Sequence, residues 1–193
     1  MQGALHAIIA VIVSLLLDGR CSIFWPRQVR HFSYHSQLQS TMPPSIRQTT
    51  IADAPTITRF NALLATETEQ ITLDQDRSRK GVEALLRDPT KGFYIVAESD
   101  NVIVGQLMIT YEWSDWRNGV FWWIQSVYVE KEARGTGVFK MLFEHIHALA
   151  KSSPDVCGLR LYVEKTNTRA KQTYERLAMH SSHYEMYEMD FVL

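Results

Sequence analysis

The sequence predicts a mixed fold of the α/β or α+β type, with a largely antiparallel central sheet and helices on both faces. Two observations support this fold class. Beyond Pro43, closely spaced strand patterns are separated by tight-turn residues, which is typical of antiparallel hairpins. The later part of the chain then alternates strand, helix, strand, helix and strand, which is typical of helices packed on a sheet. A sheet that combines both arrangements is mixed, and we expect a three-layer sandwich.

Composition limits the chain to ordinary globular classes. It has 193 residues, of which 46% are hydrophobic and 21% charged, which suits one domain with a sizeable core. The net charge of −1 favours neither nucleic acid nor an anionic membrane as a partner. The two cysteines, Cys21 and Cys157, lie far apart and without metal-ligand spacing. We therefore expect no disulfide framework and no metal site, and a reducing, cytoplasmic location.

Residues 1–42 are interpreted as an extension that precedes a domain at 43–193. Gly3–Leu17 is an apolar run of about fifteen residues, shorter than the roughly twenty that a spanning helix needs. No Lys or Arg precedes the run, and no clear small-x-small cleavage site follows it. The segment is therefore a targeting or anchoring extension, an extra apolar helix, or sequence upstream of a true start at Met42. Membrane contact is expected only if residues 1–20 are retained.

The first elements of the domain follow from capping and helical spacing. Thr50 and Asp53 form a capping-box pattern, which predicts a helix start at that point. Ile57, Phe60 and Leu64 follow at helical spacing. Pro89 ends the second expected helix, which follows this one. The expected elements are a strand at 45–49, a helix ending near Glu69 and a helix at 77–87.

The remaining elements follow from alternation, turn residues and one amphipathic stripe. Ser99–Asn101 and Ser114–Gly119 are turn sequences between strand patterns. Apolar residues at helical spacing between 138 and 149 predict a helix with one buried face. The expected elements are strands at 93–97, 102–113 and 120–129, a helix at 137–151, a strand at 159–163, a helix at 167–177 and a strand at 184–192. The last of these strands could support pairing in a homodimer.

The junction between the strand at 120–129 and the following helix has the chemistry of an anion site. Gly135 and Gly137 allow close backbone approach to a ligand, and the first N–H groups of the helix are free donors. Arg134 adds a cation suited to phosphate, so a diphosphate is the natural ligand. The alternative is that both glycines only form a tight turn. The sequence contains no Gly-Lys-Ser/Thr, which excludes a P-loop. Lys140 stands where a dinucleotide-binding fingerprint needs a third glycine, which excludes that motif as well.

This junction resembles the pyrophosphate motif of the GNAT acetyltransferase family, Q/R-x-x-G-x-G/A. If the motif begins at Arg134, Gly137 matches and Phe139 departs from the usual Gly or Ala; if it begins at Glu132, both glycines match and the glutamate departs. The resemblance implies acetyl-CoA as co-substrate and a fourth strand that splays from its neighbour, with pantetheine along its edge. The cofactor-binding residues it implies here are Val127, Tyr128 and Val129 through their backbone, and Arg134, Gly135, Thr136, Gly137, Val138 and Phe139.

A second segment, Leu161–Leu177, resembles the family's strand-Asn-helix-Tyr motif. Asn167 is a good helix N-cap by itself, and the resemblance adds a contact with pantetheine. Tyr174 lies two helical turns further on the same face. The resemblance implies that Tyr174 protonates the departing CoA thiolate, although a half-buried core tyrosine would have the same spacing. Lys171 is expected to reach either a CoA phosphate or solvent. Ala178 replaces the glycine that usually follows this helix.

The implied reaction is direct attack of a primary amine of a small molecule or peptide on the acetyl thioester. Only about one lysine-like amine in a thousand is free base at pH 7, so a group must accept its proton. Glu112 is the first candidate, Glu67 and Glu69 are alternatives, and Gln125 is expected to orient a water. Aromatic residues near these carboxylates favour a small cationic or amphipathic acceptor. The alternative function is a non-catalytic acyl-CoA-binding module.

Overall fold

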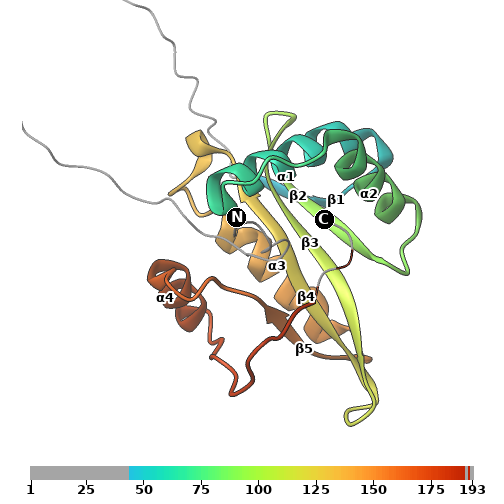
Figure 1. Cartoon of the computed structure of the whole chain (residues 1–193), viewed down its shortest axis with the longest axis vertical. Coiled ribbons are helices and arrows are strands. Elements are labelled where there is room, and N and C mark those ends of the chain that lie inside the picture. Colours follow the sequence, from blue (N-terminus) through green and yellow to red (C-terminus); the bar gives the residue numbers. More distant parts are fainter. Residues whose placement is uncertain (1–43, 190, 192–193) are drawn as a thin grey trace, which may run out of the picture.

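The computed structural model describes residues 44–189 and residue 191 (Figure 1). Predictions made for residues 1–42 and for Pro43 lie outside this range. The described elements are β1 (Ser45–Gln48), η1 (Ile51–Asp53), α1 (Ala54–Glu69), α2 (Gln75–Arg87), β2 (Gly92–Ser99), β3 (Val102–Ser114), β4 (Gly119–Val129), η2 (Lys131–Ala133), α3 (Val138–Ser152), β5 (Val156–Leu161) and α4 (Thr168–Arg176).

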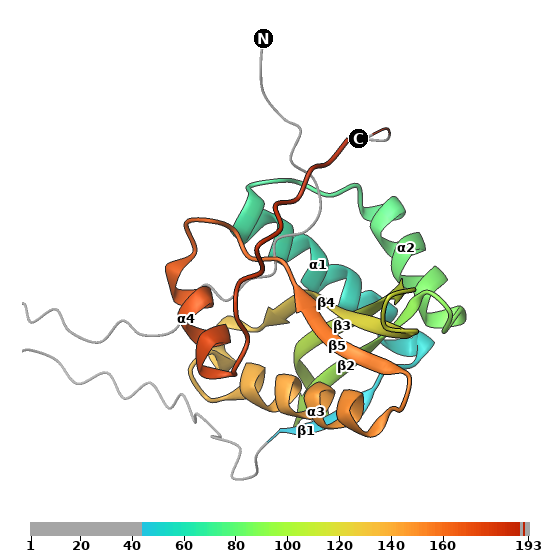
Figure 2. The same ribbon diagram turned by 90° about the horizontal axis from the view of Figure 1, so that it is seen from below.

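The sheet confirms the predicted mixed topology. Its strand order is β1-β2-β3-β4-β5, which is also the order of the strands along the chain. The first four strands pair antiparallel, and β4 pairs parallel with β5 through α3. Figure 2 shows three layers, with α1 and α2 on one face of the sheet and α3 on the other. The fold class is therefore the one that the sequence predicts.

Each face of the sheet is covered by its own apolar cluster. Strand residues with period-two alternation place Ile95, Leu107, Ile109 and Ile124 against α3, where they are almost fully buried. The other face packs Tyr94 and partly buried Met108 against the two N-terminal helices. The helix residues of that smaller cluster are Ala54, Ile57, Val82, Leu85 and Leu86. Two separate clusters therefore fix the sheet between its helical layers.

The predicted C-terminal strand is wrong for the residues that can be compared. Residues 184–189 and 191 form no strand, and the side chains of Tyr187 and Phe191 are 90% and 86% exposed. No described strand pairs with this segment, and most of its large side chains are exposed. Consequently, the expectation of a homodimer loses the pairing strand on which it was based. In the described part of the chain, no helix is both long and apolar enough to cross a membrane.

The predicted capping box is confirmed and is tied to the first strand. The Asp53 carboxylate accepts from the Thr50 backbone N–H at 2.7 Å and from both terminal nitrogens of Arg47 at 2.9 Å. The hydrogen bond from Arg47 lowers the pKa of Asp53 although burial opposes it. This contact fixes the angle at which the chain leaves β1 and enters α1.

Asp53→Asn is expected to lower the free energy of unfolding by about 2 kcal/mol at pH 7, since hydrogen bonds to charged groups contribute about 1.5–3 kcal/mol. Because the folded pKa of Asp53 is lowered, the stabilisation is present above the ordinary carboxyl pKa and is lost as pH falls through the folded value. Urea denaturation at pH 7 and pH 2 would measure both effects. An equal difference between the two proteins at both pH values would contradict this role of the Asp53 charge.

Candidate active site

The fourth strand separates from the fifth, as the resemblance implied. β4 pairs with β5 from Val120 to Ile124, and β5 ends at Leu161 while β4 continues to Val129. Residues 125–129 therefore have an edge that no described strand of the sheet pairs on the β5 side. A bulge interrupts β4 on its other side, where Ser126 has a φ of 48°. The resulting free backbone groups can bind an extended ligand as an additional strand would.

The loop after β4 forms an open anion cradle. Gly135 and Gly137 have φ values of 84° and 91°, which a residue with a side chain rarely adopts. A Cβ built on Gly137 would meet nothing within 4 Å, so the loop faces open space. The first helical hydrogen bond after it is from Met141 N–H to the Gly137 carbonyl, which leaves the preceding N–H groups as donors. The geometry and the positive end of the α3 dipole suit a diphosphate.

A glycine in β3, Gly105, allows the start of α3 to lie close to the sheet. A Cβ on Gly105 of β3 would lie 2.9 Å from Val138 Cγ1 and 3.3 Å from the Tyr128 carbonyl oxygen. The absence of a side chain at this position lets the first turn of the helix pack directly on the sheet. Val138 is 2% exposed, so its role is to anchor the helix, while its backbone belongs to the cradle.

Arg134 is held by groups of the protein itself. Its Nε donates to the Val129 carbonyl at 2.8 Å and its Nη2 donates to Glu67 at 2.8 Å, and its side chain is 10% exposed. The guanidinium also lies 5.4 Å from the centre of the Tyr128 ring. These contacts join the end of β4 to α1. Direct binding of a phosphate by Arg134 stays a prediction, and its described role is to shape the loop.

Glu67 connects three elements at this point. It pairs with Arg134 and, at 3.4 Å, with Lys131, and it accepts from the Tyr128 hydroxyl at 3.3 Å. Burial would raise the pKa of Glu67, but the hydrogen bond and charge of Arg134 outweigh it, so the pKa is lowered. Burial, followed by the Glu67 charge, raises the pKa of Tyr128 to about 12. A carboxylate with a lowered pKa is a weaker base, which disfavours Glu67 as the proton acceptor.

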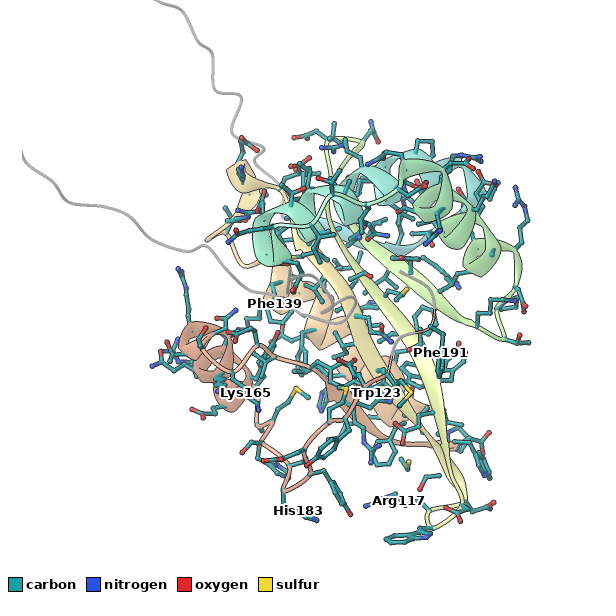
Figure 3. All side chains as sticks on the ribbon, in the orientation of Figure 1. Arg117, Trp123, Phe139, Lys165, His183 and Phe191 are labelled. Atoms are coloured by element: carbon teal, nitrogen blue, oxygen red, sulfur yellow. The ribbon has the colours of Figure 1, made fainter. Side chains whose placement is uncertain are left out.

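The two sequence motifs meet at Phe139 and Tyr174. Tyr174 of α4 is 4% exposed, and its ring lies edge-on to that of Phe139, with centroids 6.2 Å apart. Phe139 also contacts Phe143, so the bulky residue lies between α3 and α4 (Figure 3). The side chain that departs from the family pattern is thus accommodated in a helix contact. The segments that carry the two motifs therefore lie side by side.

The Tyr174 hydroxyl is a buried donor without a partner among the described residues. Burial raises its pKa, which keeps the hydroxyl protonated at neutral pH. An unpaired buried hydroxyl is costly, so such a group is expected where a ligand completes its hydrogen bonding. Asn167 has the capping role predicted for it, since its Oδ1 accepts from Ala170 N–H at 3.0 Å. The contact of Asn167 with pantetheine stays a prediction.

Comparison with known proteins agrees with this geometry. Residues 57–179, more than half of the chain, match the Acetyltransferase (GNAT) family. The chain belongs to the GNAT acetyltransferase family. The crystal structure of a possible acetyltransferase from Clostridium difficile 630 is 49% identical, with a TM-score of 0.74, over 79% of this chain and 100% of that chain. No curated protein matches the sequence significantly.

More distant GNAT-like structures share the fold. A predicted acetyltransferase with acetyl-CoA from Clostridium acetobutylicum is 16% identical, with a TM-score of 0.63, over 76% of this chain and 96% of that one. A ribosomal-protein-alanine N-acetyltransferase from Brucella melitensis biovar Abortus 2308 is 18% identical, with a TM-score of 0.61, over 77% of this chain and 99% of that one. At these identities the likeness supports the GNAT fold alone. The described chain contains no group of three or more metal-binding side chains that could hold an ion.

The predicted acceptor-side residues lie on the sheet face that carries α1 and α2. Glu112 pairs with Arg160 of β5 at 2.5 Å and also accepts from the Trp123 indole N–H. Gln125 donates to the hydroxyl of Thr110, which lies two residues before Glu112 on β3 and on the same face. Both oxygens of Glu112 therefore have partners within the protein. The structure places Glu112 and Gln125 on the same face of the sheet, with Gln125 just beyond the last paired residue of β4 and β5 and Glu112 opposite Phe121 within the paired region.

Three further predicted site residues are Lys171, Thr136 and Glu69. Lys171 donates to the Lys165 carbonyl at 2.6 Å on an exposed surface, so its contact with a CoA phosphate stays a prediction. The Thr136 hydroxyl donates to the Ala133 carbonyl at 2.7 Å and supports the loop. One oxygen of Glu69 is buried without a partner in the described chain, which keeps that carboxylate as an alternative base.

Sequence reasoning missed some polar residues of the GNAT site. Arg160, which pairs with Glu112, reads as an ordinary polar position of a strand. Gln106 is 0% exposed and contacts Asn61 of α1 and the Ser126 carbonyl of β4. Only its place in the middle of an otherwise apolar strand could have marked it. A lone polar residue in a strand is more often solvent-facing, so this pattern is not specific.

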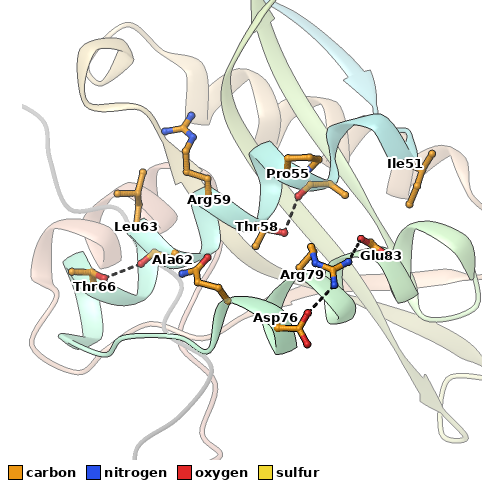
Figure 4. A pocket seen from close by; sticks show the side chains of 12 residues that line it. Ile51, Pro55, Thr58, Arg59, Ala62, Leu63, Thr66, Asp76, Arg79 and Glu83 are labelled. Carbon is orange, nitrogen blue, oxygen red and sulfur yellow. Dashed lines mark hydrogen bonds and ion pairs between the residues drawn. The ribbon is translucent and has the colours of Figure 1, made fainter.

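A groove elsewhere on the domain contains none of the predicted site residues. It has a volume of about 730 Å³ and lies between α1 and α2 (Figure 4). Its polar rim includes Arg79, which pairs with Asp76 at 2.7 Å and with Glu83 at 2.6 Å. These ion pairs stabilise α2 and leave no unpaired charge that would indicate a ligand.

Proposed function

We propose that this GNAT protein transfers the acetyl group of acetyl-CoA to a primary amine of a small molecule or peptide. The observation that carries the proposal is the free edge of β4, which leads into the glycine cradle, together with the buried, unpartnered Tyr174 hydroxyl beside Phe139 at the start of α3. The diphosphate would bind at Gly135–Gly137 and the start of α3. Pantetheine would bind along Val127–Val129, with the thioester beside Tyr174.

The reaction proceeds by direct attack in this proposal. The amine nitrogen forms a bond to the thioester carbon, and a backbone N–H of β4 stabilises the negative charge that develops on the carbonyl oxygen. The carbon–sulfur bond then breaks, and Tyr174 gives its proton to the CoA thiolate. The raised pKa of Tyr174 supports this role because the donor stays protonated until the thiolate forms.

The amine proton passes to Glu112, directly or through a water oriented by Gln125. Its place on the same sheet face as Gln125 supports this choice, and its contacts with Arg160 and Trp123 fix the carboxylate in position. The aromatic surroundings, including the stacked Trp123 and Tyr162, support a cationic or amphipathic acceptor.

Glu112→Gln is expected to lower kcat about tenfold at pH 7, with the loss shrinking as pH approaches the amine pKa. The reason is that a base is needed only while the amine arrives protonated. The pH dependence of kcat for both proteins would measure this, with Glu69→Gln as the matched comparison. An unchanged kcat in Glu112→Gln together with a loss in Glu69→Gln would transfer the role to Glu69.

The function itself is tested by thiol release from acetyl-CoA with amino acids, polyamines, aminoglycosides and peptide amino termini. Amine-dependent release of CoA is the expected result. Acetyl-CoA binding by calorimetry without turnover on any amine would favour an acyl-CoA-binding module. Absence of binding would overturn the proposal. A cytoplasmic location belongs to the same proposal, supported by the free thiol of Cys157 in the described chain.

A further inference from the structure

A small polar cluster lies buried beneath the bulge of β4. Gln106 of β3 is 0% exposed, and its Nε2 donates to Asn61 Oδ1 at 2.7 Å and to the Ser126 carbonyl at 3.1 Å. Asn61 in turn donates to the Tyr94 hydroxyl at 3.3 Å, and Tyr94 is 3% exposed. Both amide hydrogens of Gln106 are thus used, one toward α1 and one toward β4.

The contact between Gln106 and Ser126 occurs where the strand register changes. Gln106 pairs with Tyr128 and Met108 pairs with Gln125, so β4 has one residue more than β3 over this interval. Ser126 takes up the extra length with a φ of 48°, a conformation that residues with a Cβ adopt at a cost. Such a conformation persists only where neighbouring groups hold it, and the Gln106 amide is one such group.

The direction of one carbonyl also fixes the direction of the next N–H. In a trans peptide, the carbonyl of Ser126 and the N–H of Val127 lie in one plane and point in opposite directions. The Ser126 carbonyl accepts from the side-chain amide of Gln106, so the Val127 N–H points away from that amide. On the β5 side, the pairing of β4 ends at Ile124, so the Val127 peptide has no strand partner there in the described chain.

We propose that Gln106 is a positioning residue for acetyl transfer, which holds the Ser126 carbonyl so that the Val127 N–H meets the thioester oxygen. The inference rests on the proposed function. It explains why an amide occupies a fully buried position whose Oε1 has no partner in the described chain. A leucine would fill similar space without burying an unpaired oxygen, so packing alone does not account for glutamine here.

Gln106→Leu tests the inference by comparing the affinities for acetyl-CoA and for CoA in the same protein. The two ligands share every part except the acetyl group, so their affinity ratio reports on the contact with the thioester oxygen. We expect Gln106→Leu to reduce this ratio about 2- to 10-fold, the range for one hydrogen bond, with CoA affinity unchanged. The kcat for thiol release should fall about 10- to 100-fold. Met108→Leu, next on the same sheet face, is the matched control and should change neither quantity.

Asn61→Ala provides a second route that leaves the sheet intact. It removes the partner that holds Gln106 from the side of α1, and we expect a smaller change of the affinity ratio in the same direction. Equal losses of CoA and acetyl-CoA affinity in Gln106→Leu would show a general structural role and overturn the inference. An unchanged ratio and kcat in both variants would also overturn it. If the wild-type protein binds acetyl-CoA and releases thiol in these assays, the proposed function stands whichever result is found.

Discussion

Replacing Tyr174 with phenylalanine is expected to slow amine-dependent CoA release about 100-fold or more while acetyl-CoA affinity changes less than about twofold. General acids contribute rate factors of about 10²–10⁴, and the hydroxyl is the only group that the substitution removes. The ring keeps its contact with Phe139 and its place in the core. Steady-state kinetics and calorimetry on the same preparations would separate turnover from binding.

The stability of this variant provides an internal check. The Tyr174 hydroxyl is buried without a partner in the described chain, so its removal ends a desolvation cost of about 1–3 kcal/mol. We therefore expect a Tm equal to or above that of the wild type, which would exclude misfolding as the cause of a lower rate. Tyr111→Phe, at a 40% exposed tyrosine of β3, is the matched control and should retain full activity. Full activity in Tyr174→Phe would remove the general-acid assignment.

The pH dependence should follow the direction of the Tyr174 pKa. Because burial raises that pKa above the ordinary tyrosine value of 10.0, the hydroxyl stays protonated up to at least pH 10. Because burial disfavours only the ionised form, the folded protein is expected to lose stability relative to the unfolded chain as pH rises above the ordinary tyrosine pKa of 10.0. We therefore expect kcat to show no alkaline decrease below about pH 9 from loss of this proton.

Gly137→Ala is expected to weaken acetyl-CoA binding about 10-fold or more and to destabilise the protein by about 1–2 kcal/mol. The φ of 91° at this residue is unfavourable for any side chain, which accounts for the loss of stability. The new Cβ would project into the open space in front of the α3 N–H groups, where the diphosphate is proposed to bind. Calorimetric titration with acetyl-CoA and urea denaturation would measure the two effects.

Gly81→Ala is the matched control for this glycine. Gly81 lies within α2, and a Cβ there would also meet nothing within 4 Å, but its backbone is helical. Alanine should stabilise the helix by about 0.5–1 kcal/mol and leave acetyl-CoA binding unchanged. Unchanged affinity in Gly137→Ala, despite lower stability, would show that the cradle does not hold the cofactor.

Local patterns were sufficient to predict most of the fold. The helix that starts at Val138 and the strands around it carry clear periodicities, and their observed bounds differ from the predicted ones by a few residues. The segment at 184–192 shows the limit of such reasoning. Its alternating residues indicate a strand, but a strand needs a partner. Local periodicity does not predict which distant segments pair.

The site was predictable where backbone geometry decides it and less so where side chains pair at long range. The glycines of the cradle and the cap at Asn167 follow from local sequence. The pairing of Arg134 with Glu67 joins residues far apart in the chain, so a cation expected to face a phosphate was found facing α1. Glu112 likewise meets Arg160 only because β5 returns beside β4. Such contacts require the tertiary arrangement.

The contacts of Glu67 would couple an acceptor bound at the end of α1 to acetyl-CoA bound at the glycine loop. One carboxylate restrains both the end of α1 and the loop that leads to the cradle through Arg134. An acceptor that drew Glu67 toward its own amine would release that loop and change its affinity for acetyl-CoA by some factor. Thermodynamic reciprocity then requires that acetyl-CoA change the affinity for that acceptor by the same factor. The affinities for the two substrates would then be linked through the one Glu67 carboxylate.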